Sequence, residues 1–109
     1  EELLSKLSSV NFIKTDLDRV TPWMVDVLVD SKKKRDGIIR HLEKNQVETR
    51  IFYPPIHRLS PYKDKDAKFK MTSEISDRGI WLPSSVTLKE KDVEYICRKI
   101  ISFSKKNSF

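Results

Sequence analysis

The sequence predicts an α/β domain of two layers: a small, mostly antiparallel sheet with helices packed on one face. Three short runs, residues 23–29, 47–53 and 80–82, have the β-branched and aromatic composition of strands. Two other runs, residues 38–44 and 93–103, have apolar residues at helical spacing. Strands and helices that alternate over 109 residues leave room for one small core.

The composition excludes several classes of protein. With 109 residues, 38% of them hydrophobic, the chain is too short for a complete two-domain enzyme with a large cofactor cleft. A formal net charge of +6 permits polyanion binding but does not identify it. The single cysteine, Cys97, cannot form an internal disulfide, and two histidines are too few for a metal cluster of ordinary spacing. No apolar run is as long as a membrane span, so we expect a cytoplasmic domain without a membrane partner.

The first third of the chain predicts a helix end and then a strand. Leucines at helical spacing indicate that residues 1–9 are the tail of a helix that begins outside this chain. A short extended piece at residues 12–13 and a polar turn at residues 15–19 follow. Residues 21–30 are apolar on both alternating faces, which predicts a strand covered on both sides and places Trp23 in the core.

A helix capped by Asp30 or Ser31 is predicted next. Its basic start, residues 32–35, is expected to be solvated. The glycine within it costs about 1 kcal/mol relative to alanine, so this helix needs tertiary packing. Its narrow apolar stripe consists of Ile38, Ile39 and Leu42. Asn45 is expected to take the left-handed conformation that ends the helix.

A strand predicted over residues 47–53 runs into Pro54 and Pro55, which cannot extend a ladder. The chain must therefore leave the sheet there, in a loop stiffened by proline. This loop has aromatic, imidazole and guanidinium groups that suit a ligand, namely Tyr53, His57, Arg58 and Tyr62. Residues 63–70 are expected to form a charged, mobile link.

The last third of the chain predicts two helices around a brief strand. Thr72 or Ser73 is expected to open a short helix that Gly79 ends. After residues 80–82, Thr87 and Glu90 have the spacing of a capping box. The final helix is indicated most clearly, and it places Cys97 in the core as an inert thiol. Trp81 is also predicted to be a core residue.

The ordered pattern of residues 10–103 resembles the C-terminal segment of the DegT/DnrJ/EryC1/StrS family of pyridoxal-phosphate sugar aminotransferases. The pieces that match in order are Thr21-Pro22-Trp23, Glu48-Thr49-Arg50, Phe52-Tyr53, Pro55-x-His57, Pro61-Tyr62 and Gly79-Ile80-Trp81-Leu82-Pro83-Ser84. Each piece alone is a common strand, loop or cap, and only their order is informative. One departure is Gln46, which stands where the family usually has glycine.

The resemblance implies that residues 1–109 are the C-terminal small domain of a longer enzyme. Such an enzyme transfers an amino group, typically from glutamate, to a nucleotide-linked 4-keto-6-deoxy sugar and works as a homodimer. The family keeps its pyridoxal phosphate, its Schiff-base lysine and the carboxylate at the pyridinium nitrogen in the large domain. We therefore expect no catalytic residue and no cofactor-binding residue in this chain, and no activity from it alone.

Three residues are candidate substrate contacts. Arg50 on a strand is most often solvated, but a guanidinium also suits a nucleotide-sugar phosphate. His57 between prolines either hydrogen-bonds a backbone carbonyl or donates to a sugar hydroxyl; the resemblance favours the second role. Tyr53 is more often a packing residue, and the resemblance places it at the substrate as well. Tyr62 is expected to pack.

Two other functions stay open at this point. A small basic α/β nucleic-acid-binding module would stack bases on Phe52 and Tyr53, although the glycine-aromatic signature of the common RNA-binding sheet is missing. Any polynucleotide binding is expected to be non-specific and salt-sensitive. The domain could also be a dimerisation or interaction piece with no ligand of its own.

Overall fold

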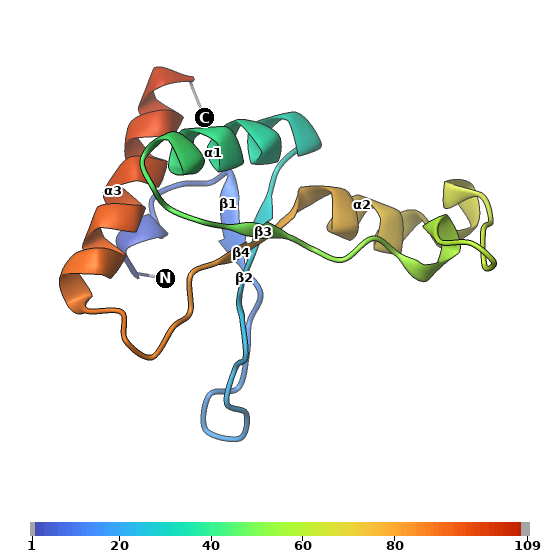
Figure 1. The fold of residues 1–109 in the computed structure, drawn as a ribbon, viewed down its shortest axis with the longest axis horizontal. Coiled ribbons are helices and arrows are strands. Elements are labelled where there is room, and N and C mark those ends of the chain that lie inside the picture. The colour runs from blue at the N-terminus through green and yellow to red at the C-terminus, as the bar shows by residue number, and fades with distance from the viewer. Residues whose placement is uncertain (1, 108–109) are drawn as a thin grey trace.

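The computed structural model describes residues 2–107, which form a four-stranded antiparallel sheet and three α-helices (Figure 1). The strands are β1 (Val10–Phe12), β2 (Val25–Val29), β3 (Arg50–Ile51) and β4 (Gly79–Leu82). Their order in the sheet is β1-β2-β4-β3, and every neighbouring pair is antiparallel. The predicted two-layer α/β fold with a small antiparallel sheet is confirmed.

The helices α1 (Lys32–Lys44) and α3 (Glu90–Lys106) pack against each other on one side of the sheet (Figure 1). The helix α2 (Lys70–Arg78) extends away from the sheet instead, together with two 3-10 turns, η2 (Ile56–Arg58) and η3 (Asp66–Phe69). The loop between β1 and β2 projects in a different direction. No helix within residues 2–107 has the length and apolar character that crossing a membrane requires.

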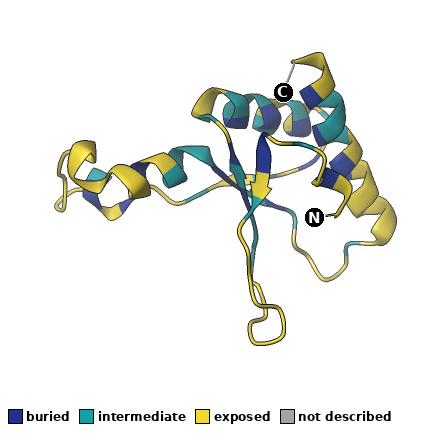
Figure 2. Ribbon diagram, turned by 180° about the vertical axis from the view of Figure 1, so that it is seen from behind, coloured by how far each residue is buried: buried dark blue, intermediate teal, exposed yellow. Residues whose placement is uncertain are grey.

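The core lies between the sheet and the pair α1 and α3. Alternate residues of the strands face it, as the period-two pattern predicts, and the apolar stripes of the two helices cover them (Figure 2). The residues that are buried almost completely are Leu4, Val27, Val29, Ile38, Leu42, Ile80 and Ile100. Cys97 is also buried, and burial raises the pKa of its thiol, which fits the predicted inert core residue.

The predicted helix tail at residues 1–9 is shorter than expected. Its first residue lies outside the described part of the chain, and the rest contains one 3-10 turn, η1 (Glu2–Leu4). Leu4 is buried against α3, whereas Leu3 is half exposed.

The prediction for Trp23 is wrong. Its side chain is 77% exposed, because Trp23 lies just before β2 begins, at the base of the projecting loop. Val27 and Val29 do face the core as predicted, so the error concerns where the strand starts. Trp81, which was also assigned to the core, is only half-buried.

The end of α1 differs from the prediction by one residue. Asn45 is the C-cap with a φ of −102°, and Gln46 takes the left-handed conformation with a φ of 61°. The amide of Asn45 instead donates to the carbonyl of His41 at 2.7 Å. Gln46 therefore takes a backbone conformation that glycine would adopt most easily.

The basic start of α1 is less solvated than expected. Arg35 is only 5% exposed, and its guanidinium donates to Asp36 and to the carbonyl of Ser76 at 3.0 Å. This contact ties α1 to α2. Ser31 is the N-cap, since its hydroxyl accepts from the backbone N–H of Lys34 at 3.2 Å.

The later helices start at other residues than predicted. Helix α2 begins at Lys70, before Thr72 and Ser73. Helix α3 begins at Glu90, and the carboxylate of Asp92 accepts from the backbone N–H of Lys89 at 2.9 Å in place of the Thr87 box. The segment expected as a charged, mobile link, residues 63–70, contains the 3-10 turn η3.

Gly79, at the start of β4, lies directly under the Phe52 ring. A Cβ at this position would come within 2.2 Å of the ring carbon Cδ2 of Phe52. The backbone of Gly79 is ordinary extended chain, so the residue serves close packing here and not an unusual conformation. The Phe52 ring in turn lies 5.2 Å from that of Trp81.

Candidate functional site

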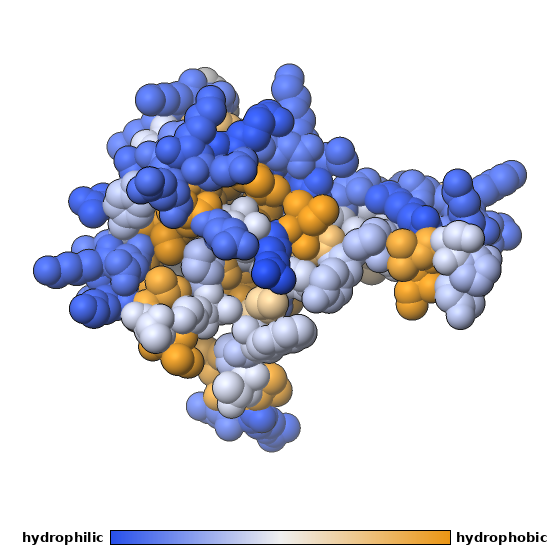
Figure 3. Space-filling model, viewed as in Figure 1, coloured by the Kyte–Doolittle hydropathy of each residue, from blue (hydrophilic) through white to orange (hydrophobic). Residues whose placement is uncertain are grey.

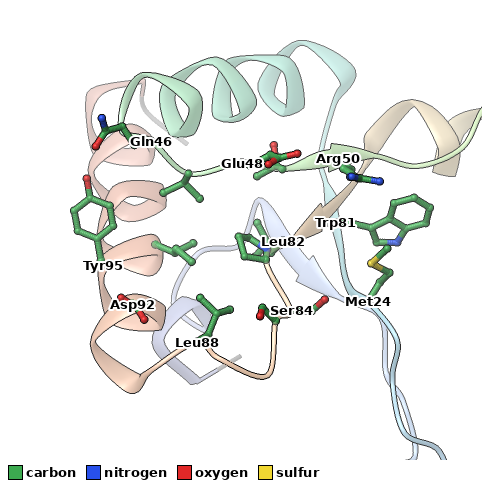
Figure 4. A pocket seen from close by; sticks show the side chains of 15 residues that line it. Met24, Gln46, Glu48, Arg50, Trp81, Leu82, Ser84, Leu88, Asp92 and Tyr95 are labelled. Carbon is green, nitrogen blue, oxygen red and sulfur yellow. The ribbon is translucent and has the colours of Figure 1, made fainter.

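An open cavity of about 610 Å³ lies beside the edge strand β3, between the sheet and the N-terminal half of α3 (Figure 4). Its apolar floor contains Val47, Leu82, Leu88 and Ile96. Apolar surface is visible between α3 and the sheet in Figure 3 as well. A concave, mostly apolar surface with a few polar groups at its rim is the usual form of a small-molecule site.

Arg50 is the cation of this cavity. It lies on β3, directly opposite Trp81 on β4, and its side chain is exposed. Within residues 2–107, no carboxylate forms an ion pair with Arg50. An exposed guanidinium without an internal partner remains available for an anionic group of a ligand.

Trp81 is held in place at the same end of the cavity. Its indole N–H donates to Asp26 of the neighbouring strand at 2.6 Å. The ring of Tyr53 meets it edge-on, with 4.8 Å between ring centroids. These contacts orient an aromatic surface beside Arg50, which Figure 4 shows at the rim.

Acidic and hydroxyl-bearing residues also line the cavity. Glu48 lies beside Arg50, two residues before it in the chain, whereas Asp92, Tyr95 and Ser84 lie further along the rim (Figure 4). The Tyr95 hydroxyl donates to the carbonyl of Asn45 at 3.1 Å, which fixes α3 against the end of α1. Carboxylates and hydroxyls can accept hydrogen bonds from sugar hydroxyls, whereas the aromatic and apolar residues can contact the faces of a sugar ring.

The three predicted site residues do not come together. Arg50 lines the cavity, and Tyr53 is 66% exposed next to it through its contact with Trp81. His57 lies elsewhere, in η2, and is only 6% exposed. Sequence reasoning missed the roles of Asp92 and Trp81, because only the packing of α3 and the register of β3 against β4 bring them to the cavity that Arg50 lines. It also assigned no role to Glu48, although Glu48 lies two residues before Arg50.

His57 belongs to a compact network with η3 and α2. Its Nε2 lies 2.9 Å from Asp66 and 3.1 Å from the hydroxyl of Ser73, and its ring stacks on Phe69. The Ser73 hydroxyl donates to the Phe69 carbonyl at 2.8 Å, so it accepts from the imidazole. Nε2 therefore carries the proton. In a catalytic serine-histidine-aspartate triad, the serine and the aspartate contact different nitrogens of the ring. Here Ser73 and Asp66 both contact Nε2, so the three residues do not form such a triad.

Arg58 completes this network by clamping two carboxylates. It contacts Asp66 at 3.0 Å and Asp77 at 2.6 Å. Arg58 and then His57 lower the pKa of Asp66 to about 2, and Arg58 lowers the pKa of Asp77. The two carboxylates in turn raise the pKa of Arg58. The network joins η2, η3 and α2 into one unit.

Replacing Asp66 with asparagine should weaken this unit in a pH-dependent way. The folded-state pKa of Asp66 is about 2, below the ordinary value near 4. Its contribution to stability is thus present above about pH 4 and lost as the pH falls towards about 2. The difference in unfolding free energy between the wild type and Asp66→Asn should be largest near neutral pH and shrink over that window.

Urea unfolding at a series of pH values measures this difference. Glu94→Gln is the matched control, because Glu94 is exposed on α3 and outside the network. A difference for Asp66→Asn that stays constant from pH 7 to pH 2 would contradict the role of the charge.

The cavity beside β3 and a second cavity between α1 and α3 both lack the groups that pyridoxal phosphate requires. This cofactor needs a lysine for covalent attachment and a carboxylate at its ring nitrogen. The cavity beside β3 has carboxylates but no lysine among its lining residues. The cavity between α1 and α3 has lysines but no carboxylate. Neither set fits the cofactor, and no chemical step through it follows from these residues.

The fold of this chain is similar to part of two larger proteins of known structure. The fold matches that of a protein assigned as a sugar aminotransferase from Streptococcus pneumoniae, with a TM-score of 0.80 and 19% identity over 96% of this chain and 28% of that one. It also matches 3-amino-5-hydroxybenzoic acid synthase, with a TM-score of 0.79 and 16% identity over 96% of this chain and 31% of that one. The fold of this chain therefore also occurs as part of these two larger proteins.

The family follows from sequence. Residues 1–101 match the DegT/DnrJ/EryC1/StrS aminotransferase family, and the chain belongs to it. The chain is 35% identical over 83 residues to GDP-perosamine synthase of Escherichia coli O157:H7, and 34% identical over 85 residues to that of Vibrio cholerae. These matches cover 76% and 74% of this chain but 23% of each relative. The chain thus spans about a quarter of the length of the curated relatives that it matches.

Proposed function

We propose that this chain is the C-terminal small domain of a pyridoxal-phosphate-dependent aminotransferase that acts on a nucleotide-linked 4-keto-6-deoxy sugar. Family membership over residues 1–101 is the observation that carries the proposal. The similarity to two GDP-perosamine synthases supports a sugar of this kind, made for a cell-surface polysaccharide. Glutamate as the amino donor, a homodimeric parent and a cytoplasmic location belong to the same proposal.

The cavity beside β3 is the part of this domain that we assign to the substrate. The guanidinium of Arg50 would bind a phosphate of the nucleotide. Tyr53 packs edge-on against the Trp81 ring next to Arg50. Glu48, beside Arg50, and Asp92, across the cavity, supply acceptors for sugar hydroxyls. The chain's own residues bind and orient a sugar nucleotide in this scheme, and the remaining part of the parent supplies the cofactor and the chemistry.

His57 has a different role in this proposal from the one predicted for it. The predicted role was donation to a sugar hydroxyl, but Asp66 and Ser73 already accept the hydrogen bond from the Nε2–H of His57. We therefore assign it to positioning: it anchors the loop after β3, and so helps to place Tyr53. Direct substrate contact by His57 remains the competing prediction, which the half-reaction assay of the Discussion separates.

A nucleic-acid-binding module is less well supported. Such a module needs both aromatic rings of the strand to be open for stacking. Phe52 lies over Gly79 and against Trp81, and only Tyr53 is largely exposed. We propose that this domain has no specific nucleic-acid partner.

The test compares the full-length parent with this chain alone. The parent, loaded with pyridoxal phosphate, should convert its cofactor to the amine form with glutamate. It should then aminate a GDP-linked 4-keto-6-deoxy sugar, which mass spectrometry detects. The isolated chain, mixed with the cofactor and reduced with borohydride, should show no stoichiometric label on a lysine. A stoichiometric label on one lysine of this chain would refute the assignment of the cofactor to the remaining part of the parent. A parent without transfer activity would favour a purely structural role for this domain.

A further inference from the structure

A second cavity, of about 520 Å³, lies between α1 and α3, and the proposed function makes no use of it. It follows one face of α1, where Lys33, Gly37, Arg40 and Lys44 recur at helical spacing. From Lys33 to Lys44 this face extends about 16 Å, at about 1.5 Å per residue. Phe103 and Asn107 of α3 form the other wall.

The charge of this cavity is of one sign. Four of its lining residues, Lys33, Lys34, Arg40 and Lys44, are cationic, and none is a carboxylate. Lys34 pairs with Asp30, but no ion pair within residues 2–107 involves Lys33, Arg40 or Lys44. Figure 3 shows hydrophilic side chains over the part of the molecule where α1 lies. Unpaired cations along a groove produce a positive potential that concentrates anions.

The floor of the cavity is aromatic and close to the helix backbone. The Phe103 ring lies over Gly37, where a Cβ would come within 2.7 Å of the ring carbon Cζ. The ring of His41 lies 5.3 Å from that of Phe103, and its Nε2 is 3.3 Å from the hydroxyl of Ser102. Gly37 therefore allows α3 to approach α1, and this approach sets the groove between them.

We propose that this groove binds a small anion with two or more linked phosphate groups, either free oligophosphate or the diphosphate of a nucleotide. A single phosphate could contact only some of these cations, whereas two or three linked phosphates can contact more of them at the same time. The volume is that of a small-molecule site. The hydroxyl of Ser31 and the amide of Asn107 add neutral donors at the rim.

Isothermal titration calorimetry on this 109-residue chain, in 150 mM salt, tests the proposal with orthophosphate, pyrophosphate, tripolyphosphate and GDP. Tripolyphosphate should bind at least about tenfold more tightly than orthophosphate. Arg40→Ala and Lys44→Ala should each weaken tripolyphosphate binding by about fivefold or more. Both side chains are exposed, so the variants should keep the circular dichroism spectrum of the wild type.

Lys63→Ala is the matched control, because it removes one exposed positive charge from the other end of the molecule. GDP that binds more tightly than pyrophosphate would identify a nucleotide ligand whose base contacts Phe103, and equal affinities would identify free oligophosphate. Equal losses in Lys63→Ala and Arg40→Ala, equal affinities for orthophosphate and tripolyphosphate, or no binding below millimolar concentration would each overturn the proposal.

Discussion

Replacing Leu42 with alanine should lower the free energy of unfolding of this domain by about 2–5 kcal/mol. Leu42 is 0% exposed and lies where α1 meets α3 and the sheet. The substitution removes buried methyl groups and leaves a cavity that the surrounding helices can close only in part. A loss of this size is a large fraction of the total stability of a small domain, which is about 5–15 kcal/mol.

Urea denaturation followed by circular dichroism measures this loss. Leu17→Ala is the matched control, because Leu17 is 70% exposed in the loop between β1 and β2. That variant should change stability by no more than about 0.5 kcal/mol. If the two variants lost equal stability, the core between α1, α3 and the sheet would be wrongly assigned.

Replacing Arg50 with alanine in the full-length parent should lower kcat/KM for the nucleotide sugar by about tenfold to a hundredfold. Hydrogen bonds to charged groups contribute about 1.5–3 kcal/mol, and each 1.4 kcal/mol is a factor of about ten. The half-reaction with glutamate should be unchanged, because the amino donor carries no nucleotide. Arg50→Lys should restore only part of the activity, since an ammonium group cannot bind a phosphate in the bidentate manner of a guanidinium.

Arg98→Ala is the control for Arg50→Ala, because Arg98 is exposed on α3 and does not line the cavity. His57→Ala, measured in the same assay, separates its two roles. A direct contact predicts a loss of about threefold to tenfold with the nucleotide sugar alone and an unchanged melting temperature. A positioning role predicts a lowered melting temperature, because the Asp66 and Ser73 network loses its centre. Equal losses in both half-reactions for Arg50→Ala would contradict a role at the nucleotide.

The sequence was sufficient for the architecture because the signals involved are local. Apolar spacing identified α1 and α3, and alternation identified the core face of β2. The boundaries were less predictable. Trp23 looks like part of the strand by composition, but no partner strand continues beside it, since β2 pairs with β4 only from Val25 onward. Tertiary pairing, and not propensity, decides where a strand begins.

The candidate site was only partly predictable, for a different reason. Arg50 and Tyr53 were identified because they belong to the strand and loop whose ordered residues resemble the family pattern. Trp81 and Asp92 come 31 and 42 residues after Arg50, and only the register of β3 against β4 and the packing of α3 place them around the same cavity. His57 was predicted to contact a ligand because it is a polar residue in a proline-rich loop. Its partners Asp66 and Ser73 could not be predicted, because they meet His57 only when the loop folds back onto α2.

The close approach of Gly79 and Phe52 constrains how this domain can diverge. Because a side chain at position 79 would occupy the volume of the aromatic ring, the two positions must change together or not at all. Phe52 lies between Arg50 and Tyr53, so any drift at position 79 would also move the residues assigned to the substrate. In an alignment of homologues, we would expect positions 52 and 79 to covary. Grafting the loop after β3 from one relative into another should succeed only when the residue at position 79 is transferred with it.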